Sequence, residues 1–315
     1  MKIFITCVVM VWASVAIADD LLVCDLLGDQ VLRYDGTTGA FLGVFASGSV
    51  IDGPEGITVG PDGNVYIASE YSANVTKWSP SGTYLGEFVS PGEGGLFGEQ
   101  DLEFGPDGNL YVMGHIAPES DSIWKFDGTT GTFIGMHGLG GGPGHTHGMS
   151  WRASDGDLYQ GQLNGPYVIN HFNGVTGGLE GVFTTADELA IMNDMLWGPD
   201  DDLYVSNPLI DGMLVGGIIR FDGATGAYMG VFSDAGGAVS TWGMAFEGEY
   251  LYYTASNSVV RVLASTGGGA SFFVSPGSGG LSSASSIAFV VPEPASILAI
   301  ALGLAFFSAR RCNRQ

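Results

Sequence analysis

The ten residues Gly-Pro-Asp-Gly-Asn-Val-Tyr-Ile-Ala-Ser at 60–69 occur in five related copies, which begin at residues 60, 105, 153, 198 and 247. Asp-Gly favours a tight turn, and the alternating apolar and aromatic residues after it favour a strand. The tyrosine of each copy is followed by the next one 45, 48, 45 and 48 residues later; these are Tyr66, Tyr111, Tyr159, Tyr204 and Tyr252. A steady period near 45 residues indicates a radial repeat.

Each period contains three further strand-like segments. In the first copy these are the segment 56–59 before the turn and the segments 75–79 and 84–88 after it. The last two are joined by a Ser-Pro-Ser-Gly or Asp-Gly-x-Thr-Gly turn in most copies. Four short strands in a period of this length are typical of a β-propeller blade. We predict blades at 54–90, 99–138, 146–184, 192–233 and 240–274.

The sixth blade is divided between the two ends of the repeat region. Leu22 lies 44 residues before Tyr66 and marks a copy that lacks its innermost strand. The missing segment is found at 286–290, so this blade combines 286–290 with 21–45. Pairing of the two ends closes the ring and removes an exposed sheet edge. The sequence therefore predicts an all-β, six-bladed propeller of four-stranded blades over residues 19–290.

The chain is strongly acidic. It has 315 residues, with 33 Asp and Glu against 10 Lys and Arg, and 45% of its residues are hydrophobic. Four of the ten cations lie in the terminal segments, so residues 19–291 keep six cations against 32 acids, a net charge of −26. A disordered acidic chain would contain fewer apolar residues. A nucleic-acid partner is not expected, because the repeat region has no basic cluster.

The first 18 residues are predicted to be a signal peptide. Lys2 precedes an apolar run at 3–15, and Ala16-Ile17-Ala18 has the small residues of a cleavage site, with Ala16 and Ala18 at its key positions. An N-terminal membrane anchor is the alternative, but the run is short for a bilayer. The exported region keeps one cysteine, Cys24, and so contains no internal disulfide.

The last 25 residues have three parts in a fixed order. They are Pro292-Glu293-Pro294, an apolar stretch at 295–309, and a basic end with Arg310 and Arg311. Fifteen helical residues span about 22 Å, and snorkelling arginines help such a short helix to cross a bilayer.

This arrangement closely resembles the PEP-CTERM sorting signal of Gram-negative bacteria; a plain tail anchor is the alternative. The resemblance implies an exosortase-type sorting enzyme as partner, which acts near the PEP motif. It also implies transient anchoring in the inner membrane through a transmembrane helix at 295–309. The body would then reach the periplasm, cell surface or extracellular space, where such proteins are often associated with exopolysaccharide or biofilm.

The repeats resemble those of the NHL-repeat and gluconolactonase/regucalcin propellers. The resemblance is carried by Pro54-Glu55-Gly56-Ile57 together with the block at 60–66 and its copies. It covers nearly all of residues 21–290. This fold hosts lyases, lactonases and pure binding proteins, so the resemblance implies a fold rather than an activity.

A candidate site lies where the innermost strands begin. The loops between second and third strands vary in length and share a face with these starting points, so we expect function there. The residue before each innermost strand should reach the mouth of the axial channel; these six are Glu55, Gln100, His147, Asn193, Trp242 and Ser285. Polar residues at a channel mouth are also expected simply because they meet water.

Oxygen and nitrogen donors in this ring could hold a divalent metal, Ca or Zn. The candidate ligands are Glu55, His145, His147, Asn193 and Asp194. The resemblance to gluconolactonases implies Glu55 and Asn193 as ligands, but Trp242 stands where that family has an acid. Of the histidines expected in NHL-type lyases, only His147 matches. No catalytic residue is assigned.

Two functions follow from these observations. The first is a cell-surface or extracellular-matrix binding or structural protein whose ligand is a polysaccharide or a protein. The alternative is a metal-dependent lactonase or lyase with its site on the propeller axis.

Overall fold

The computed structural model describes residues 19–116, 120–143, 148–162, 167–189, 192–206, 209–210, 213–214, 216–234 and 240–292. The signal peptide with Ala16 and Ala18, the pair His145 and His147, and the sorting signal from Glu293 onward lie outside these residues. Within the described residues, no helix is long and apolar enough to cross a membrane.

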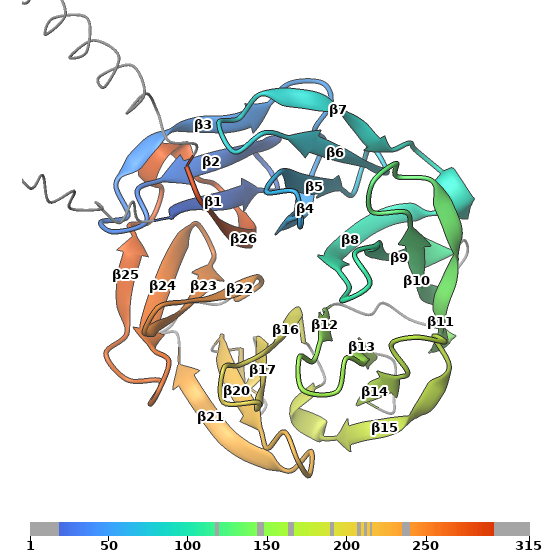
Figure 1. The fold of residues 1–315 in the computed structure, drawn as a ribbon. Helices are drawn as coiled ribbons and strands as arrows, with labels where there is room; N and C mark the ends of the chain where they lie inside the picture. Colours follow the sequence, from blue (N-terminus) through green and yellow to red (C-terminus); the bar gives the residue numbers. More distant parts are fainter. Residues whose placement is uncertain are drawn as a thin grey trace, which may run out of the picture.

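Six antiparallel four-stranded sheets surround a central axis (Figure 1). The first two complete blades contain β4 (Pro54–Val59), β5 (Val65–Ser69), β6 (Asn74–Trp78) and β7 (Tyr84–Val89), then β8 (Phe97–Phe104), β9 (Leu110–Ile116), β10 (Ser120–Phe126) and β11 (Phe133–Pro143). The next two contain β12 (Met149–Trp151), β13 (Leu158–Gln162), β14 (Val168–Phe172) and β15 (Leu179–Thr185), then β16 (Asp194–Trp197), β17 (Leu203–Ser206), β20 (Gly217–Phe221) and β21 (Tyr228–Asp234).

The fifth complete blade contains β22 (Met244–Glu247), β23 (Tyr250–Ala255), β24 (Ser258–Leu263) and β25 (Ser271–Val274). In the fourth complete blade, a separate hairpin of β18 (Leu209–Ile210) and β19 (Met213–Leu214) is inserted in the chain between β17 and β20. Three short 3-10 helices complete the described elements: η1 (Glu93–Gly95), η2 (Asp187–Leu189) and η3 (Ser278–Gly280).

The composite blade confirms the predicted closure. Its strand order is β26 (Ala284–Val290), β1 (Asp20–Asp25), β2 (Gln30–Tyr34) and β3 (Phe41–Ser47). β26 and β1 are antiparallel, with Val290 opposite Asp20 and Ile287 opposite Val23. The six-bladed ring is therefore closed by its own two ends, as the repeat pattern predicts.

The tyrosines of the repeat hold neighbouring blades together. The Tyr66 ring packs edge-on against Phe88 of its own blade and Phe104 of the next, with ring centroids 4.8 and 4.9 Å apart. Equivalent triplets surround Tyr111, Tyr159, Tyr204 and Tyr252. Each such aromatic pair stabilises the fold by about 0.5–1.5 kcal/mol beyond its buried area. The core therefore lies mainly between blades and fixes the positions of the innermost strands.

The aspartates of the repeat form turns. Asp62 Oδ1 accepts a hydrogen bond from the Asn64 backbone N–H at 3.0 Å, and its Oδ2 accepts one from the Tyr66 hydroxyl at 3.1 Å. Lys77 Nζ lies 2.8 Å from the same Oδ2. Although partial burial opposes ionisation, the hydrogen bonds from Lys77, Asn64 and Tyr66 outweigh it and lower the pKa of Asp62 to about 2.

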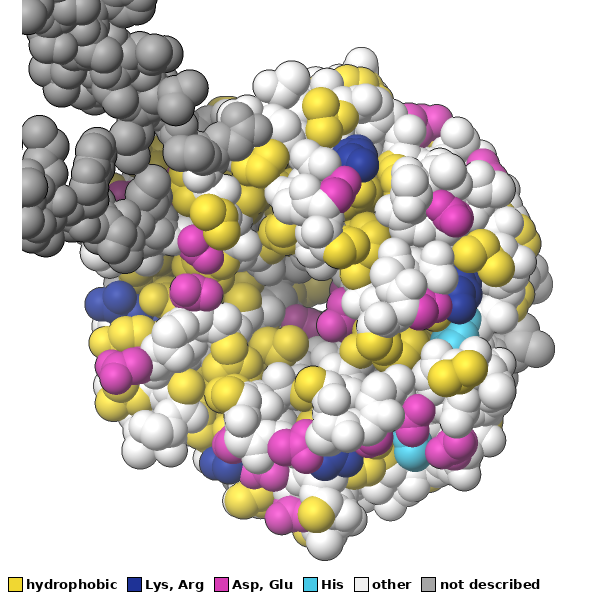
Figure 2. Space-filling model, in the orientation of Figure 1, with side chains coloured by type: hydrophobic (Ala, Val, Ile, Leu, Met, Phe, Trp, Pro, Cys, Tyr) yellow, Lys and Arg dark blue, Asp and Glu magenta, His cyan; other side chains and the backbone are white. Residues whose placement is uncertain are grey.

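The two faces of the ring differ in structure. We call the face with the Asp-Gly and Thr-Gly turns the turn face; its acidic and basic side chains gather in groups around the ring (Figure 2). We call the opposite face the cup face, where the innermost strands begin. The Glu70 N–H donates to the Gly53 carbonyl oxygen at 2.9 Å, so a loop between second and third strands lies beside the start of β4. The loop between the second and third strands and the start of the innermost strand therefore share a face, as the sequence predicts.

Candidate functional site

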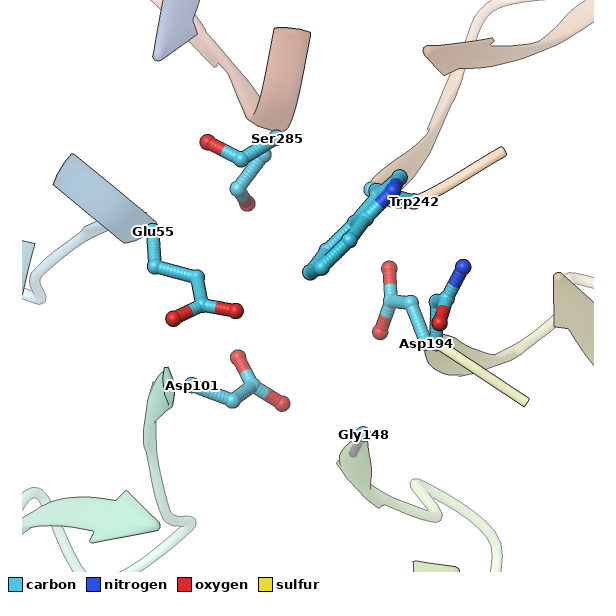
Figure 3. Close-up of a pocket in the computed structure, with 9 residues that line it drawn as sticks. Glu55, Asp101, Gly148, Asp194, Trp242 and Ser285 are labelled. Atoms are coloured by element: carbon cyan, nitrogen blue, oxygen red, sulfur yellow. The ribbon is translucent and has the colours of Figure 1, made fainter. Parts of the chain in front are cut away.

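A small axial cavity of about 20 Å³, room for roughly one water molecule or ion, opens where the six innermost strands begin. All six blades contribute to its wall, which we call the axial cup (Figure 3). The lining residues are Glu55, Asp101, Gly148, Asn193, Asp194, Trp242, Gly243, Ser285 and Ser286. Because the blades converge on the axis, residues from distant parts of the chain meet here.

Three carboxyl groups point into the cup from different blades: Glu55, Asp101 and Asp194 (Figure 3). Glu55 is only 6% exposed, and its Oε2 has no hydrogen-bond partner among the described residues. A buried carboxylate oxygen without a partner is destabilising, because it loses its hydration and gains nothing in exchange. Glu55 is thus available for a ligand that enters the cup.

Asp101 and Asp194 also link neighbouring blades. Asp101 accepts hydrogen bonds from the Leu102 N–H at 2.8 Å and, across the blade boundary, from the Met149 N–H at 3.0 Å. Asp194 repeats the arrangement with the N–H groups of Met195 at 2.7 Å and Met244 at 2.9 Å. These bonds fix the two carboxylates in orientation at the base of the cup.

The residue before each methionine that donates across a blade boundary is a glycine, and the close contact between neighbouring innermost strands requires it. Gly148 has φ +81°, and a Cβ there would lie 2.8 Å from the Met195 backbone nitrogen. A Cβ on Gly243 would lie 2.6 Å from Ser286 Cα. The alternation of aspartate and glycine around the axis therefore allows the innermost strands to approach one another closely.

Burial makes the cup a poor environment for negative charge. It raises the pKa of Glu55 well above its ordinary value, helped by the nearby Glu70 and Asp101 carboxylates. Burial and then Asp101 raise the pKa of Asp194 well above its ordinary value. Deeper in the channel, the pKa of Glu103 is raised well above its ordinary value by burial, and then by Asp101. A cation in the cup would offset the desolvation of these carboxylates and their repulsion of one another, and would lower their pKa values again.

Basic side chains do not provide this compensation among the described residues. The described ion pairs of Arg33, Lys77, Lys125, Arg152 and Arg220 all involve acids of the turn face. Two backbone hydrogen bonds favour the ionised form of Asp101, yet burial outweighs them and raises its pKa. The cup is consequently an acidic site without a protein counter-ion in the part of the chain that the structure describes.

Five of the predicted site residues lie at the cup: Glu55, Asn193, Asp194, Trp242 and Ser285. The Asn193 amide nitrogen donates to the Thr241 carbonyl oxygen at 2.7 Å, which leaves the amide oxygen for a ligand. Ser285 Oγ donates to the Pro54 carbonyl oxygen at 2.8 Å, so this hydroxyl links two blades. The Trp242 ring forms part of the wall (Figure 3).

The remaining predicted ligands cannot be assigned to the cup. His145 and His147 lie outside the described residues, as does the side chain of Gln100. Asp101 and Glu103, which were not among the predicted ligands, contribute charge to the axis. The sequence does contain a signal for Asp101: it occupies the same position in Asp-Leu-Glu-Phe-Gly as Asp194 does in Asp-Met-Leu-Trp-Gly.

The donor atoms of the cup are of the type that a hard divalent cation prefers, although the carboxylate oxygens of Glu55, Asp101 and Asp194 do not all lie within 4.8 Å of one another. The donors described there are oxygens, from three carboxylates and one amide, and such donors suit Ca²⁺ better than Zn²⁺. The unpartnered Glu55 oxygen is the observation that supports this fit. Glu55, Asp101, Asn193 and Asp194 would hold the ion.

A second acidic group lies on the turn face and is explained without a ligand. It consists of Asp155, Asp157 and His171. His171 Nε2 lies 2.8 Å from Asp157 Oδ2, and the imidazole stacks on the Tyr159 ring at 4.6 Å. His171 occupies the position that Lys77 has in the first complete blade, opposite the repeated tyrosine. It thus stands where the other turns have lysine or arginine.

Comparison with known proteins identifies the sorting signal and the fold. Residues 290–311 match the PEP-CTERM protein-sorting motif. The chain is therefore exported through exosortase-dependent sorting in a Gram-negative bacterium, with transient membrane anchoring before processing. No curated protein sequence matches the chain.

Several solved structures share the propeller. A nidogen/laminin complex chain has a TM-score of 0.67 at 15% identity, covering 87% of this chain and 99% of that one. A gluconolactonase from Xanthomonas campestris has a TM-score of 0.59 at 16% identity, with coverages of 75% and 79%. Virginiamycin B lyase from Staphylococcus aureus has a TM-score of 0.53 at 16% identity, with coverages of 72% and 72%. Identities this low establish the fold alone.

Proposed function

We propose that this exported propeller is a cation-dependent binding protein of the cell surface or extracellular matrix. Its axial cup would hold one Ca²⁺, and an extracellular polysaccharide or protein would dock on the cup face with oxygen atoms directed at that ion. The observation that carries the proposal is the buried, unpartnered oxygen of Glu55 beside the carboxylates of Asp101 and Asp194.

The charge of the body supports a role for the cation in ligand binding. Residues 19–291 have a net charge of −26, so the protein repels anionic partners over the range of a Debye length. A divalent ion in the cup would reverse the local field at the place where a ligand meets the axis. An acidic polysaccharide could then be bound at the mouth through its oxygen atoms.

A second candidate is a metal-dependent hydrolase or lyase, favoured by the pKa of Glu55. A carboxyl with a pKa well above its ordinary value can exchange protons nearer neutral pH, as a general acid or base must. When bound, a divalent cation polarises the carbonyl of an ester or lactone. Asp101 and Asp194 would orient the site, and Glu55 would hold or release the proton. The likeness to gluconolactonase and lyase structures is compatible with this role.

Calcium titration of the purified protein, followed by calorimetry, tests the proposed cation site. We expect one Ca²⁺ per chain, and a loss of affinity of roughly tenfold or more in Glu55→Gln and Asp194→Asn, because each removes a charged ligand. Asp127→Asn on the turn face is the matched control and should bind like the wild type. Failure of the wild type to bind Ca²⁺ even at about 1 mM, a concentration typical of extracellular sites, would refute the proposal.

Two further measurements separate the binding protein from the enzyme. The binding protein would be retained on immobilised acidic polysaccharide, would be released by a chelator, and would leave the polysaccharide chemically unchanged. Turnover of a lactone or ester that requires Ca²⁺ and disappears in Glu55→Gln would favour the enzyme.

A further inference from the structure

We infer that the turn face lies toward the bilayer while the chain is membrane-anchored, and that the axial cup faces away from it. The bilayer surface is thus the partner of the turn face at this stage. This orientation follows from the place where the chain leaves the propeller and from the length of the tether. It does not depend on what the cup binds.

The last strand connects the two faces. β26 begins at the cup, where Ser285 and Ser286 line the wall. It ends at Val290, which pairs with Asp20 at the beginning of β1. Val291 follows and is 64% exposed. The chain therefore leaves the propeller at the end of β26 remote from the cup.

Contacts of the neighbouring residues place this exit on the turn face. The Asp20 carboxylate forms an ion pair with Arg33 Nε at 2.6 Å, and the Arg33 guanidinium also donates to the Pro80 carbonyl oxygen of the next blade's turn at 3.2 Å. The backbone of Asp19 lies against Gly36, in the turn between β2 and β3. Both the start of β1 and the end of β26 are thus part of the turn face.

The tether is too short to permit another orientation. Four residues, 291–294, separate the end of β26 from the apolar stretch that begins at Ala295. Even when fully extended they reach about 14 Å, and two of them are prolines. The seven residues of β26 span about 23 Å from cup to exit. A tether of this reach cannot pass around the propeller to bring the cup face to the membrane.

The same lengths place the turn face close to the lipid. Since the headgroup region of one leaflet is roughly 6 Å thick, the exit lies within about 8 Å of the headgroup surface. The turn face itself offers little attraction for an anionic leaflet. Asp127 and Asp222 are partly exposed there, and hydrogen bonds within their turns, chiefly from Thr130 and Thr225, lower the pKa of both carboxyls. Proximity is therefore imposed by the tether.

This orientation has a consequence for the cup. In the anchored chain its mouth points into the surrounding solution, so a ligand can reach the axis before the sorting enzyme has acted. Once the tether is cut, the acidic turn face should leave the membrane, because it has no attraction of its own for anionic lipid.

Single-cysteine labelling of the full chain tests the orientation. Thr37 and Ser49 are both exposed and lie beyond opposite ends of β3, on the turn face and the cup face respectively. The variants Thr37→Cys and Ser49→Cys would be made with Cys7→Ser and Cys312→Ser; Cys24 is fully buried. They would be produced in a host without a sorting enzyme, and labelled with a fluorophore in right-side-out vesicles that contain headgroup-quencher lipids.

We expect severalfold stronger quenching at position 37 than at position 49. Equal quenching at both positions, stronger quenching at 49, or no quenching at either would overturn the inference. Unlabelled variants with melting temperatures near that of the parent show that the fold is retained. A flexible Gly/Ser insertion between Val291 and Pro292 is the matched control: quenching at 37 should fall, and its persistence would contradict a tether-imposed contact.

Discussion

The turn face and the cup face use the same chemical group in opposite ways. On the turn face, Asp62 and Asp107 accept hydrogen bonds from lysine, asparagine and tyrosine, and although burial opposes it, these bonds lower the pKa of each to about 2. In the cup, burial and neighbouring acids raise the pKa values of Glu55 and Asp194 well above ordinary. The acidity of this protein is therefore not a property of its surface in general. Compensated acids build the turns, and uncompensated acids mark the site.

The turn face also joins the blades, and disrupting that junction should give the largest effect. Gly131 has φ +74°, and a Cβ there would overlap the Phe88 carbonyl oxygen of the preceding blade. Gly131→Ala should lower the free energy of unfolding by about 2–4 kcal/mol, because strain in the left-handed region adds to a backbone clash. Chemical denaturation measures the change.

Gly63→Ala is the matched control for this prediction. Gly63 has φ +76°, but a Cβ there would meet no described atom within 4 Å, so only the conformational strain of about 1 kcal/mol applies. Equal destabilisation by both substitutions would show that the turns do not hold the blades together.

The cup should give a smaller effect, of opposite sign. Glu55→Gln should stabilise the cation-free protein at pH 8 by about 1–3 kcal/mol, because it removes a carboxyl group whose ionisation is disfavoured by burial and by the neighbouring acids. The folded-state pKa lies above the ordinary value of 4.5, so the unfolded chain releases this proton first as pH rises. The free energy of unfolding of the wild type therefore falls as pH rises above about 4.5. The variant has no titrating group at position 55 and should not show this part of the decrease.

Thermal unfolding from pH 4 to pH 8, with chelator present, measures this difference. The stabilisation by Glu55→Gln should vanish near pH 4, where the wild-type carboxyl is protonated in both states. A variant less stable than the wild type at pH 8 without cation would show that Glu55 has a counter-ion in the folded protein.

The smallest effect is expected for a single turn aspartate. Asp62→Asn should destabilise by less than about 1 kcal/mol at pH 7, because its ion pair with Lys77 is partly exposed and screened. The folded-state pKa is depressed, so the wild-type advantage should disappear as pH falls from about 4 towards 2. Melting temperatures across that range provide the measurement, and a difference that grows on acidification would contradict this account.

Much of this protein could be predicted because its repeats constrain one another. The recurring tyrosines fixed the number of blades, and the segment at 286–290 identified the closing strand; both predictions are confirmed. Blade limits were less accurate where a repeat departs from the pattern. β11 continues to Pro143, beyond the predicted limit of 138.

The candidate site was only partly predictable. Aligning the residues before each innermost strand brought Glu55 and Asn193 to the axis, as the structure places them. Asp101 shares the position of Asp194 in the aligned repeats, but only Asp194 is among the predicted ligands. The importance of Asp101 lies in the Met149 N–H across the blade boundary and in its repulsion of Glu55. Neither contact can be inferred from a single repeat.

By itself, the sequence determined the propeller, its closure and the sorting signal, because each is a pattern of residues along the chain. The tertiary structure alone decided which acids are compensated and which are not. Asp62 and Glu55 carry the same formal charge, but one meets Lys77 and the other meets Asp101 and Glu70. The pKa of a carboxyl depends on burial and on charges within a few ångströms, and in a closed ring those neighbours come from blades far apart in the chain.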